Sequence, residues 1–311
     1  MVELRLYRYF TAVAEALHFG RAAEALGIAQ PPLSQQIRLL ERQLGTELLL
    51  RTKRRVELTE TGRVFLEQAR QVLQAAAQAE DAARRAARGE VGRLAIGMVS
   101  SATYEDLIPA AVLRFRERFP EVALELQERT TNEQVELLHR GTIQIGFVRP
   151  PVQDASITLE VVKREPLVIA LPSAHRLAKQ AKVAVADLAA EAWILLPPEL
   201  GLGFYDLVLG VCLRAGFTPR TSHAAAQIHT MISLVAAGLG VTIVPASVRN
   251  LRRPGVVYRE TLEEAPMAET AAAYLASSRS AVLENFLRAV RSAARRPGAR
   301  AYSRIARKTR L

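Results

Sequence analysis

A segment near the N-terminus carries polar groups at the spacing that a helix reading a nucleic acid needs. Its polar residues fall on one helical face: Ser34, Gln35, Arg38 and Arg42. Its apolar residues recur at spacings of four, three and four, which predicts that they are buried: Leu33, Ile37, Leu40 and Leu44. Ser and Gln can hydrogen-bond to base edges in the major groove, and Arg can hold phosphates. A plain αα-hairpin with a solvated face is the alternative.

The residues before this helix form a tight turn. A first helix over residues 21–26 ends at Gly27, a residue suited to the left-handed conformation. Pro31 and Pro32 open the second helix, where a missing N–H has no cost. An amphipathic helix over residues 3–17 can cover this hairpin. The sequence therefore predicts three helices around one small core.

Two short strands, 48–50 and 56–58, follow, and a cationic tip lies between them. Four of the five tip residues are basic: Arg51, Lys53, Arg54 and Arg55. These charges repel one another unless an anion receives them, although a solvated turn is the alternative. A helix-turn-helix followed by a basic wing is much more specific than either part alone, so we expect double-stranded DNA as a partner.

A long helix over residues 59–88 links this region to the rest of the chain. It carries an unbroken heptad repeat of apolar residues: Phe65, Ala69, Val72, Ala76, Ala79, Ala83 and Ala86. Thr59 suits the N-cap, although Gly62 stands where a capping box would place Glu. A helix packed on its own domain is the alternative, but the length of the repeat favours a dimerisation helix.

From residue 90 the chain alternates strands and helices in two halves. Repeated βα units predict parallel sheets with helices on both faces, and ligands in such folds bind outside the carboxyl ends of the strands. The residues expected there are Ser101, Thr103, Thr131, Arg149, Phe204, Gln227 and Ile228. The alternatives are that Ser101 and Thr131 cap the following helices and that Arg149 pairs with a nearby acid.

Composition limits the remaining possibilities. The chain has 311 residues, of which 50% are apolar, so it can bury more than one core. One cysteine and five scattered histidines offer neither a disulfide framework nor metal-ligand spacing, so no metal or cofactor is expected. Without a signal peptide or a membrane-spanning run, we expect a cytoplasmic protein with no membrane partner. Much of the net charge of +11 lies in the last 21 residues, and we expect residues 296–311 to form a disordered basic tail.

Over almost its whole length the chain resembles a LysR-type transcriptional regulator. The resemblance rests on YFTAVAEALHFGRAAEALGIAQPPLSQQIRLLERQLGTELLLR, VELTETG, FVRPP and LVAAGLGVTIVPAS. It implies an α+β multidomain protein with a winged helix-turn-helix, a linker helix and a two-subdomain α/β effector domain like that of periplasmic binding proteins. The implied ranges are 1–58 for DNA binding, 59–89 for the linker and dimerisation helix, 90–163 with 269–295 for subdomain I, 164–268 for subdomain II, and 296–311 for the tail.

The resemblance also implies partners and site residues. Such regulators are typically homotetramers, formed from dimers, that activate or repress transcription when a small inducer binds, and RNA polymerase is a candidate partner. Positions that contact DNA in similar regulators match Gln30, Pro32 and Ser34, and the wing contact matches Arg54 or Arg55. Gln35 departs from the pattern, since an Arg often follows the Ser, and this leaves the preferred half-site bases open.

AQPPLS, ATY and FVRPP are similar to the branch that controls aromatic-compound catabolism. Ser101 and Thr131 match the hydroxyl-bearing inducer positions of that branch, and Arg149 fits the FVRPP motif. The expected inducer is an aromatic-derived carboxylate such as a muconate-like acid. An amino acid or a sugar phosphate is the alternative.

Two other protein classes share parts of this pattern. A solute-binding protein would have the two αβ halves, but it would need an export signal and would not carry a DNA-binding head. A hydrolase could use Ser101 or Ser247 with His223 or His229, but the chain has no G-x-S-x-G elbow. We therefore expect no catalytic residues and no enzymatic activity.

Overall fold

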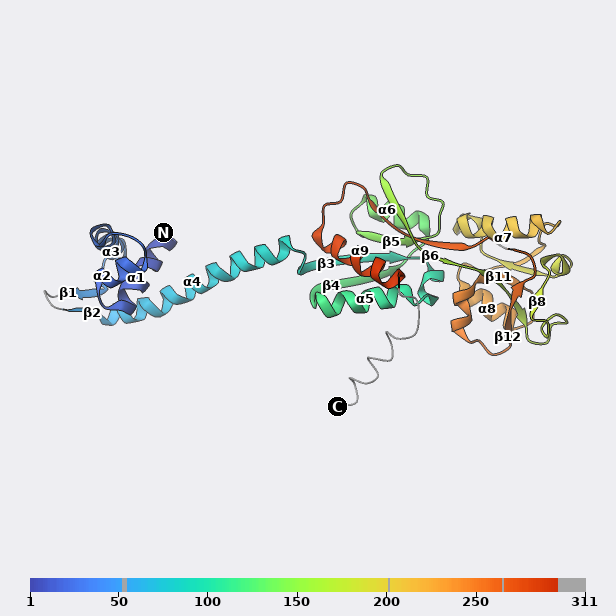
Figure 1. The fold of residues 1–311 in the computed structure, drawn as a ribbon, viewed down its shortest axis with the longest axis horizontal. Coiled ribbons are helices and arrows are strands. Elements are labelled where there is room, and N and C mark those ends of the chain that lie inside the picture. The colour runs from blue at the N-terminus through green and yellow to red at the C-terminus, as the bar shows by residue number, and fades with distance from the viewer. Residues whose placement is uncertain (52–54, 201, 265, 296–311) are drawn as a thin grey trace. The chain divides into compact units, whose positions relative to one another are not determined.

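The computed structural model describes residues 1–51, 55–200, 202–264 and 266–295, and the chain divides into two compact units (Figure 1). The first unit spans Met1–Ala86, and the second begins at Ala87. Arg54 and the predicted basic tail, 296–311, lie outside the described residues. No helix within the described ranges is both long enough and apolar enough to cross a membrane.

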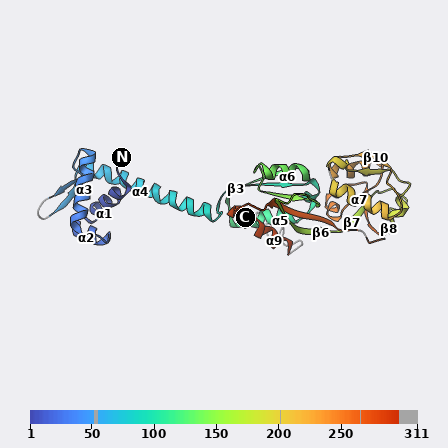
Figure 2. The same ribbon diagram turned by 90° about the horizontal axis from the view of Figure 1, so that it is seen from above.

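Three short helices form the core of the first unit, and a hairpin and a long helix follow them (Figure 2). The elements are α1 (Leu4–Ala16), α2 (Phe19–Ala25), α3 (Gln30–Leu44), β1 (Leu49–Arg51), β2 (Val56–Leu58) and α4 (Glu60–Ala87). The core includes Leu6, Phe10, Val13, Leu33, Ile37 and Leu40. The predicted three-helix core is confirmed, and Gly27 adopts the left-handed conformation with a φ of 65°. Leu44 is 36% exposed, so the buried stripe of α3 ends one turn earlier than predicted.

The junction between the hairpin and α4 explains the glycine in the VELTETG motif. The Thr59 hydroxyl accepts a hydrogen bond from the Gly62 N–H at 2.8 Å, which confirms Thr59 as a cap of α4. A Cβ atom at Gly62 would lie 2.0 Å from the carbonyl oxygen of Leu48. A capping-box Glu cannot occupy position 62, because any side chain there would collide with the backbone before β1.

The heptad repeat of α4 falls into two parts. Ala69 is fully buried, and the ring of Phe65 stacks on Tyr7 of α1 with the centroids 5.4 Å apart. This end of the repeat therefore packs on its own unit, which was the alternative to a dimerisation helix. Val72 is 39% exposed and the later repeat positions Ala79, Ala83 and Ala86 are exposed, while Ala76 is half-buried. An apolar stripe along most of α4 is thus left uncovered within the chain.

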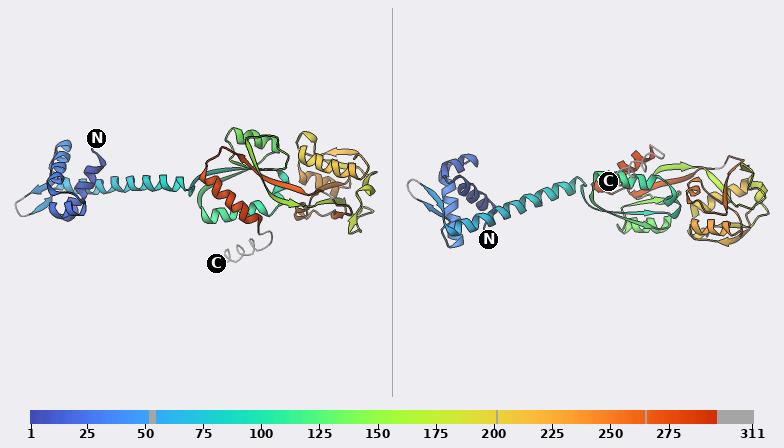
Figure 3. Two further views of the ribbon diagram at one scale, coloured as in Figure 1. Left: turned by 45° about the horizontal axis from the view of Figure 1, so that its top comes forward. Right: turned by 90° about the horizontal axis from the view of Figure 1, so that it is seen from below.

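Subdomain I of the second unit contains a five-stranded sheet with helices on both faces (Figure 3). Its elements are β3 (Val91–Met98), the 3₁₀ helix η1 (Ser100–Tyr104), α5 (Leu107–Arg118), β4 (Glu121–Glu128), α6 (Thr131–His139), β5 (Ile145–Val148), β6 (Ile157–Glu165), β13 (Ala268–Leu275) and α9 (Ala281–Ala294). Helices α5 and α9 pack on one face around Phe115 and Phe286, whose centroids are 5.3 Å apart. Leu138 of α6 joins the smaller core on the other face.

The sheet of subdomain I is mixed, so the predicted parallel sheet is wrong in part. The strand order is β4-β3-β5-β13-β6, with β3 parallel to β4 and β5. Strand β13 runs antiparallel to both β5 and β6. The physical reason is that the chain leaves this subdomain along β6 and returns along β13, which inserts between β5 and β6 in the opposite direction.

Subdomain II is built around a four-stranded sheet with the order β11-β7-β12-β8. Its strands and helices are β7 (Leu167–Pro172), β8 (Lys182–Val183), η2 (Val185–Leu188), β9 (Trp193–Leu195), η3 (Pro198–Leu200), α7 (Leu202–Arg214), β10 (Thr221–Ala224), α8 (Ile228–Ala236), β11 (Thr242–Pro245), η4 (Ala246–Leu251) and β12 (Val256–Thr261). Strand β7 is antiparallel to β11 and β12, which again differs from the predicted parallel arrangement. Strands β6 and β12 lie outside the predicted elements, because most of their residues are only half-buried and give no long apolar run.

Candidate functional site

The polar face predicted on α3 is accessible. Gln30, Pro32, Gln35 and Arg38 are exposed, and Ser34 is half-buried. Leu33, Ile37 and Leu40 of the same helix are fully buried, so this helix cannot turn its polar residues inward. Ala29 is the N-cap and makes no side-chain hydrogen bond, and Pro31 lies in the first turn. The N-terminal half of α3 can therefore enter a groove with its polar side chains first.

The hairpin beside α3 supplies exposed positive charge. Strands β1 and β2 pair antiparallel, with Arg51 opposite Val56. Arg55 is exposed, and its guanidinium lies 4.0 Å from the carboxylate of Glu57. Both side chains of this pair are more than half exposed, so water weakens the attraction between them and Arg55 lies at the surface of the hairpin.

A cavity of about 720 Å³ lies between the two subdomains of the second unit. Six residues predicted to contact a ligand line it: Ser101, Thr131, Arg149, Phe204, Gln227 and Ile228. Thr103 does not line it, because its side chain is exposed and its hydroxyl donates to the Ser100 carbonyl at 2.6 Å. This corrects the prediction for Thr103, which the short helix η1 turns away from the cavity.

Several helices begin at the cavity wall. Ser101 lies in the first turn of η1, Thr131 is the first residue of α6, and Ile228 is the first residue of α8. The first turn of a helix presents unpaired N–H groups and a positive partial charge. Phe204 and Ile228 add an apolar wall. The cavity therefore suits a small molecule with an anionic end and a carbon skeleton.

Ser101 and Thr131 do not cap these helices, so that alternative is wrong. The hydroxyl of Thr130, not that of Thr131, accepts from the Glu133 N–H, and Glu133 accepts in return from the Thr130 N–H at 2.7 Å. The Thr131 hydroxyl instead accepts from the Arg149 N–H at 3.3 Å. The Ser101 hydroxyl accepts from the Arg149 guanidinium. Ser101 and Thr131 both line the cavity.

Each nitrogen of the Arg149 guanidinium bonds to a group of the protein. Nε donates to the Ser101 hydroxyl at 3.0 Å, and Nη1 donates to the Glu269 carbonyl at 3.0 Å. Nη2 donates to Glu105 at 3.2 Å and lies 3.7 Å from Glu165. The alternative that Arg149 pairs with a nearby acid is therefore correct. The planar fork predicted for a ligand carboxylate is already engaged, because each of its three nitrogens bonds to a group of the chain.

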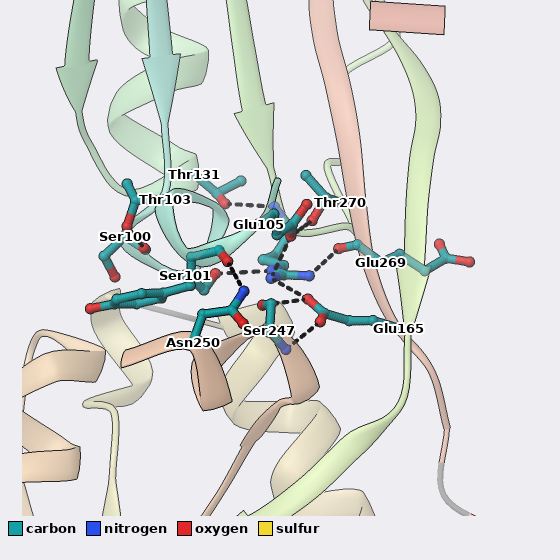
Figure 4. A network of polar contacts seen from close by, with 12 residues as sticks. Ser100, Ser101, Thr103, Glu105, Thr131, Glu165, Ser247, Asn250, Glu269 and Thr270 are labelled. Carbon is teal, nitrogen blue, oxygen red and sulfur yellow. Dashed lines mark hydrogen bonds and ion pairs between the residues drawn. The ribbon is translucent and has the colours of Figure 1, made fainter. Parts of the chain in front are cut away.

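The carboxylates around Arg149 join both subdomains (Figure 4). Glu165 accepts from the N–H of Ser247 at 2.7 Å and from its hydroxyl at 3.0 Å, at the start of η4. Glu105 is 1% exposed and accepts from the Thr270 hydroxyl at 2.5 Å. Burial raises the pKa of Glu105 above its ordinary value, and the charge of Arg149 opposes this shift. The cluster fastens subdomain II to both strands that cross between the subdomains.

Other cavity residues escaped prediction. Arg129 follows β4 directly, so the rule that identified Thr131 also covers it. Asp154 lies in an irregular segment that carries no sequence signal. Hydrogen bonds from Ser156 and His139 lower the pKa of Asp154 to about 2, and His139 Nε2 is 2.7 Å from its carboxylate. Arg129 and Asp154 both line the cavity beside the predicted contacts.

Ser101, Ser247 and His223 bond to other groups than one another. Ser247 bonds to Glu165, and Ser101 bonds to Arg149. His223 contacts the exposed hydroxyl of Ser222 at 3.1 Å. Within the described part of the chain, no group of three or more His, Cys, Asp or Glu residues could hold a metal ion.

Two family models match the chain. The model described as "Bacterial regulatory helix-turn-helix protein, lysR family" matches residues 4–63, and the one described as "LysR substrate binding domain" matches residues 87–295. The HTH-type transcriptional regulator AlsR of Bacillus subtilis (strain 168) is 41% identical over 286 residues, covering 92% of this chain and 94% of that protein. The HTH-type transcriptional regulator CatR of Pseudomonas putida is 43% identical over 262 residues, covering 84% and 89%. The crystal structure of full-length CbnR complexed with its target DNA is 32% identical with a TM-score of 0.81, covering 94% of this chain and 100% of that chain.

Proposed function

The chain belongs to the LysR family of DNA-binding transcriptional regulators, and we propose that it binds an interrupted inverted repeat in duplex DNA and a small carboxylate in its cavity. The observation that carries this proposal is the combination of an exposed polar face on α3 with a cavity between two α/β subdomains. In this proposal residues 1–58 bind DNA, residues 59–89 join two protomers, and the two subdomains sense the inducer. Protomers pair as dimers along the uncovered stripe of α4, and a homotetramer forms from these dimers.

The DNA interface is assigned to two parts of the first unit. Side chains in the first turns of α3 read base edges: Gln30, Pro32, Ser34 and Gln35. Cations further along α3 and on the hairpin hold phosphates: Arg38, Arg54 and Arg55. Apart from the half-buried Ser34, the described members of this set are exposed, and this exposure supports the assignment together with the likeness to CbnR, which was solved with its target DNA. The two-fold symmetry of a dimer is expected to be mirrored in the site.

Base-reading and phosphate-holding residues should differ in their response to salt and sequence. The test duplex is one that the wild-type protein selects from random sequences. Gln35→Ala, or Ser34→Ala, is expected to reduce the difference in binding free energy between this duplex and random DNA by about 1–3 kcal/mol. Arg55→Ala should weaken binding to selected and random duplexes alike and reduce the salt slope by about 1. Fluorescence anisotropy across a salt series measures both quantities. Equal wild-type affinity for selected and random duplexes would contradict specific recognition.

The inducer is proposed to be an aromatic-derived carboxylate, with a muconate-like acid as the leading compound. The N–H groups that start η1, α6 and α8, together with the hydroxyls of Ser101 and Thr131, would receive its anionic end. Phe204, Gln227 and Ile228 would contact the carbon skeleton. In this assignment Arg149 orients the Ser101 hydroxyl through a hydrogen bond and does not bind the ligand carboxylate, because its guanidinium already contacts Glu105 and Glu165. An amino acid or a sugar phosphate remains the alternative ligand class.

Thermal shift with cis,cis-muconate tests the cavity assignment. At about 100 times its dissociation constant, the ligand should stabilise the protein by about 2.7 kcal/mol. Thr131→Ala should reduce this gain, since it removes a hydroxyl at the cavity wall. Thr103→Ala makes the same chemical change outside the cavity and is the matched control. An equal loss in both variants would contradict the cavity assignment, and stabilisation by amino acids or sugar phosphates alone would contradict the carboxylate class.

A further inference from the structure

One carboxylate on α3 holds the first residues of the wing hairpin. Oε1 of Glu41 accepts from the backbone N–H groups of Leu48 at 3.1 Å and Leu49 at 3.2 Å. Oε2 of the same side chain accepts from the Arg51 guanidinium at 2.6 Å. The Glu41 side chain is only 13% exposed, so water competes little for these bonds. Charge-assisted bonds of this kind are about twice as strong as neutral ones.

Arg51 extends this contact to a second helix. Its guanidinium carbon lies 5.1 Å from the centroid of the Phe19 ring in α2, close enough for a cation–π interaction. The Arg51 side chain is 27% exposed. Strand β1 is therefore tied to α3 through Glu41 and to α2 through Arg51, its last residue.

The other end of the hairpin is fixed to a different element. Thr59, which follows β2, donates its hydroxyl to the Glu47 carbonyl at 2.9 Å and caps α4. These contacts hold the hairpin to the start of α4 but not to α3. Strands β1 and β2 have three residues each, and a two-stranded hairpin of this size is marginally stable by itself. Two kinds of contact set its angle to α3: Leu48 and Leu49 are buried in the core of the first unit, and Glu41 bonds to the start of the hairpin.

We propose that Glu41 is a positioning residue for DNA binding, which fixes the wing at the angle to α3 at which both contact one duplex. This inference rests on the proposed DNA-binding function and adds a residue that touches no DNA itself. A wing that is already ordered loses little conformational entropy when it meets the phosphates. The tie is made by an acid, which by charge alone would repel DNA. Removing this acid should therefore weaken DNA binding if Glu41 positions the wing, and should leave binding unchanged or tighten it if only its charge matters.

Glu41→Gln and Glu60→Gln separate these two roles. Both variants remove one negative charge from the first unit, but Glu60 is 83% exposed and pairs with Arg63 on the surface of α4. Charge alone predicts unchanged or slightly tighter DNA binding in both. The positioning role predicts that Glu41→Gln weakens binding to the selected duplex about tenfold and lowers the salt slope by about 1, as expected when a wing phosphate contact is lost. Glu60→Gln should show neither change. Anisotropy titrations of the full chain over a salt series give both numbers.

Amide hydrogen exchange tests the same tie without DNA. In Glu41→Ala, the amides of Leu48 and Leu49 should exchange at least tenfold faster, whereas those of the buried stretch of α3 around Ile37 should keep their protection. Unchanged exchange at Leu48 and Leu49 overturns the proposal. Glu41→Gln binding with the affinity and salt slope of Glu60→Gln also overturns it. A wild-type protein with no preference for its selected duplex would instead count against the proposed function.

Discussion

Arg149→Ala is expected to lower the free energy of unfolding of the effector domain by about 3–5 kcal/mol, a large effect for a residue at a ligand cavity. The side chains of Arg149, Glu105 and Glu165 are 8%, 0% and 6% exposed. Removing the guanidinium takes away the cation that lies within 4 Å of both buried carboxylates. It also removes the donor to the Ser101 hydroxyl. Urea unfolding of the full chain, followed by fluorescence of Trp193 in subdomain II, measures the loss.

An exposed arginine in the same sheet provides the control. Arg164 pairs with Glu269 at 2.7 Å, but these side chains are 63% and 34% exposed. Such a pair contributes about 1 kcal/mol or less, because water solvates both partners. Arg164→Ala should therefore change the urea midpoint little. Equal losses in the two variants would show that the Arg149 cluster does not fasten the subdomains.

The loss of unfolding free energy caused by Arg149→Ala should grow with increasing pH. Burial raises the pKa of Glu105 in the folded protein above its value in the unfolded chain. The stabilisation by protonated Glu105 is therefore fully present below the pKa of the unfolded chain, and it is lost as the pH rises through the pKa of the folded protein. Without Arg149 the folded pKa rises further, and the loss extends to higher pH. The deficit relative to wild type should therefore grow as pH increases from the unfolded value. Adding Glu105→Gln to Arg149→Ala should recover part of the stability at neutral pH, and a pH-independent deficit would contradict this account.

The sequence could locate Ser101 and Thr131 because loops at the carboxyl ends of neighbouring parallel strands meet at one sheet edge. Thr103 was placed wrongly, since only the 3₁₀ turn of η1 decides which residues after β3 face the cavity. The partners of Arg149 could not be found from the sequence. Glu105 and Glu165 are 60 residues apart and meet only because two strands cross between the subdomains.

The fold was predictable where periodicity reflects burial. The helical spacing of Leu33, Ile37 and Leu40 identified the core face of α3, because one helix side is wholly buried. The directions of the strands were not predictable, since a strand has the same residue pattern whichever way it runs. Thus β13 was expected to be parallel and is antiparallel to its neighbours. In α4 the heptad pattern could not distinguish Phe65, which packs on α1, from Val72, which is exposed.

Ala76→Glu is expected to abolish self-association and to weaken binding to a two-half-site duplex by about 10²–10⁴-fold. Ala76 lies in the uncovered apolar stripe of α4. A charge in a close-packed seam of small residues has no partner there, and burying it costs several kcal/mol in the dimer. The isolated protomer should lose little stability, because Glu is a good helix former. Light scattering gives the mass, and titration with one-site and two-site duplexes gives the affinities.

Ala77→Glu is the matched control for this prediction, since it adds the same charge at an exposed neighbouring position outside the heptad repeat. Charge repulsion between the added carboxylate and DNA should be similar in both variants and should act on one-site and two-site duplexes alike. Loss of the dimer should instead reduce affinity for the two-site duplex alone, because the two heads then bind independently. Ala76→Glu protein with unchanged mass and unchanged preference for two sites would place the dimer contact away from α4. If the α4 stripe forms the dimer contact, only Ala76→Glu should lose affinity for the two-site duplex. The two variants should then bind the one-site duplex with equal affinity.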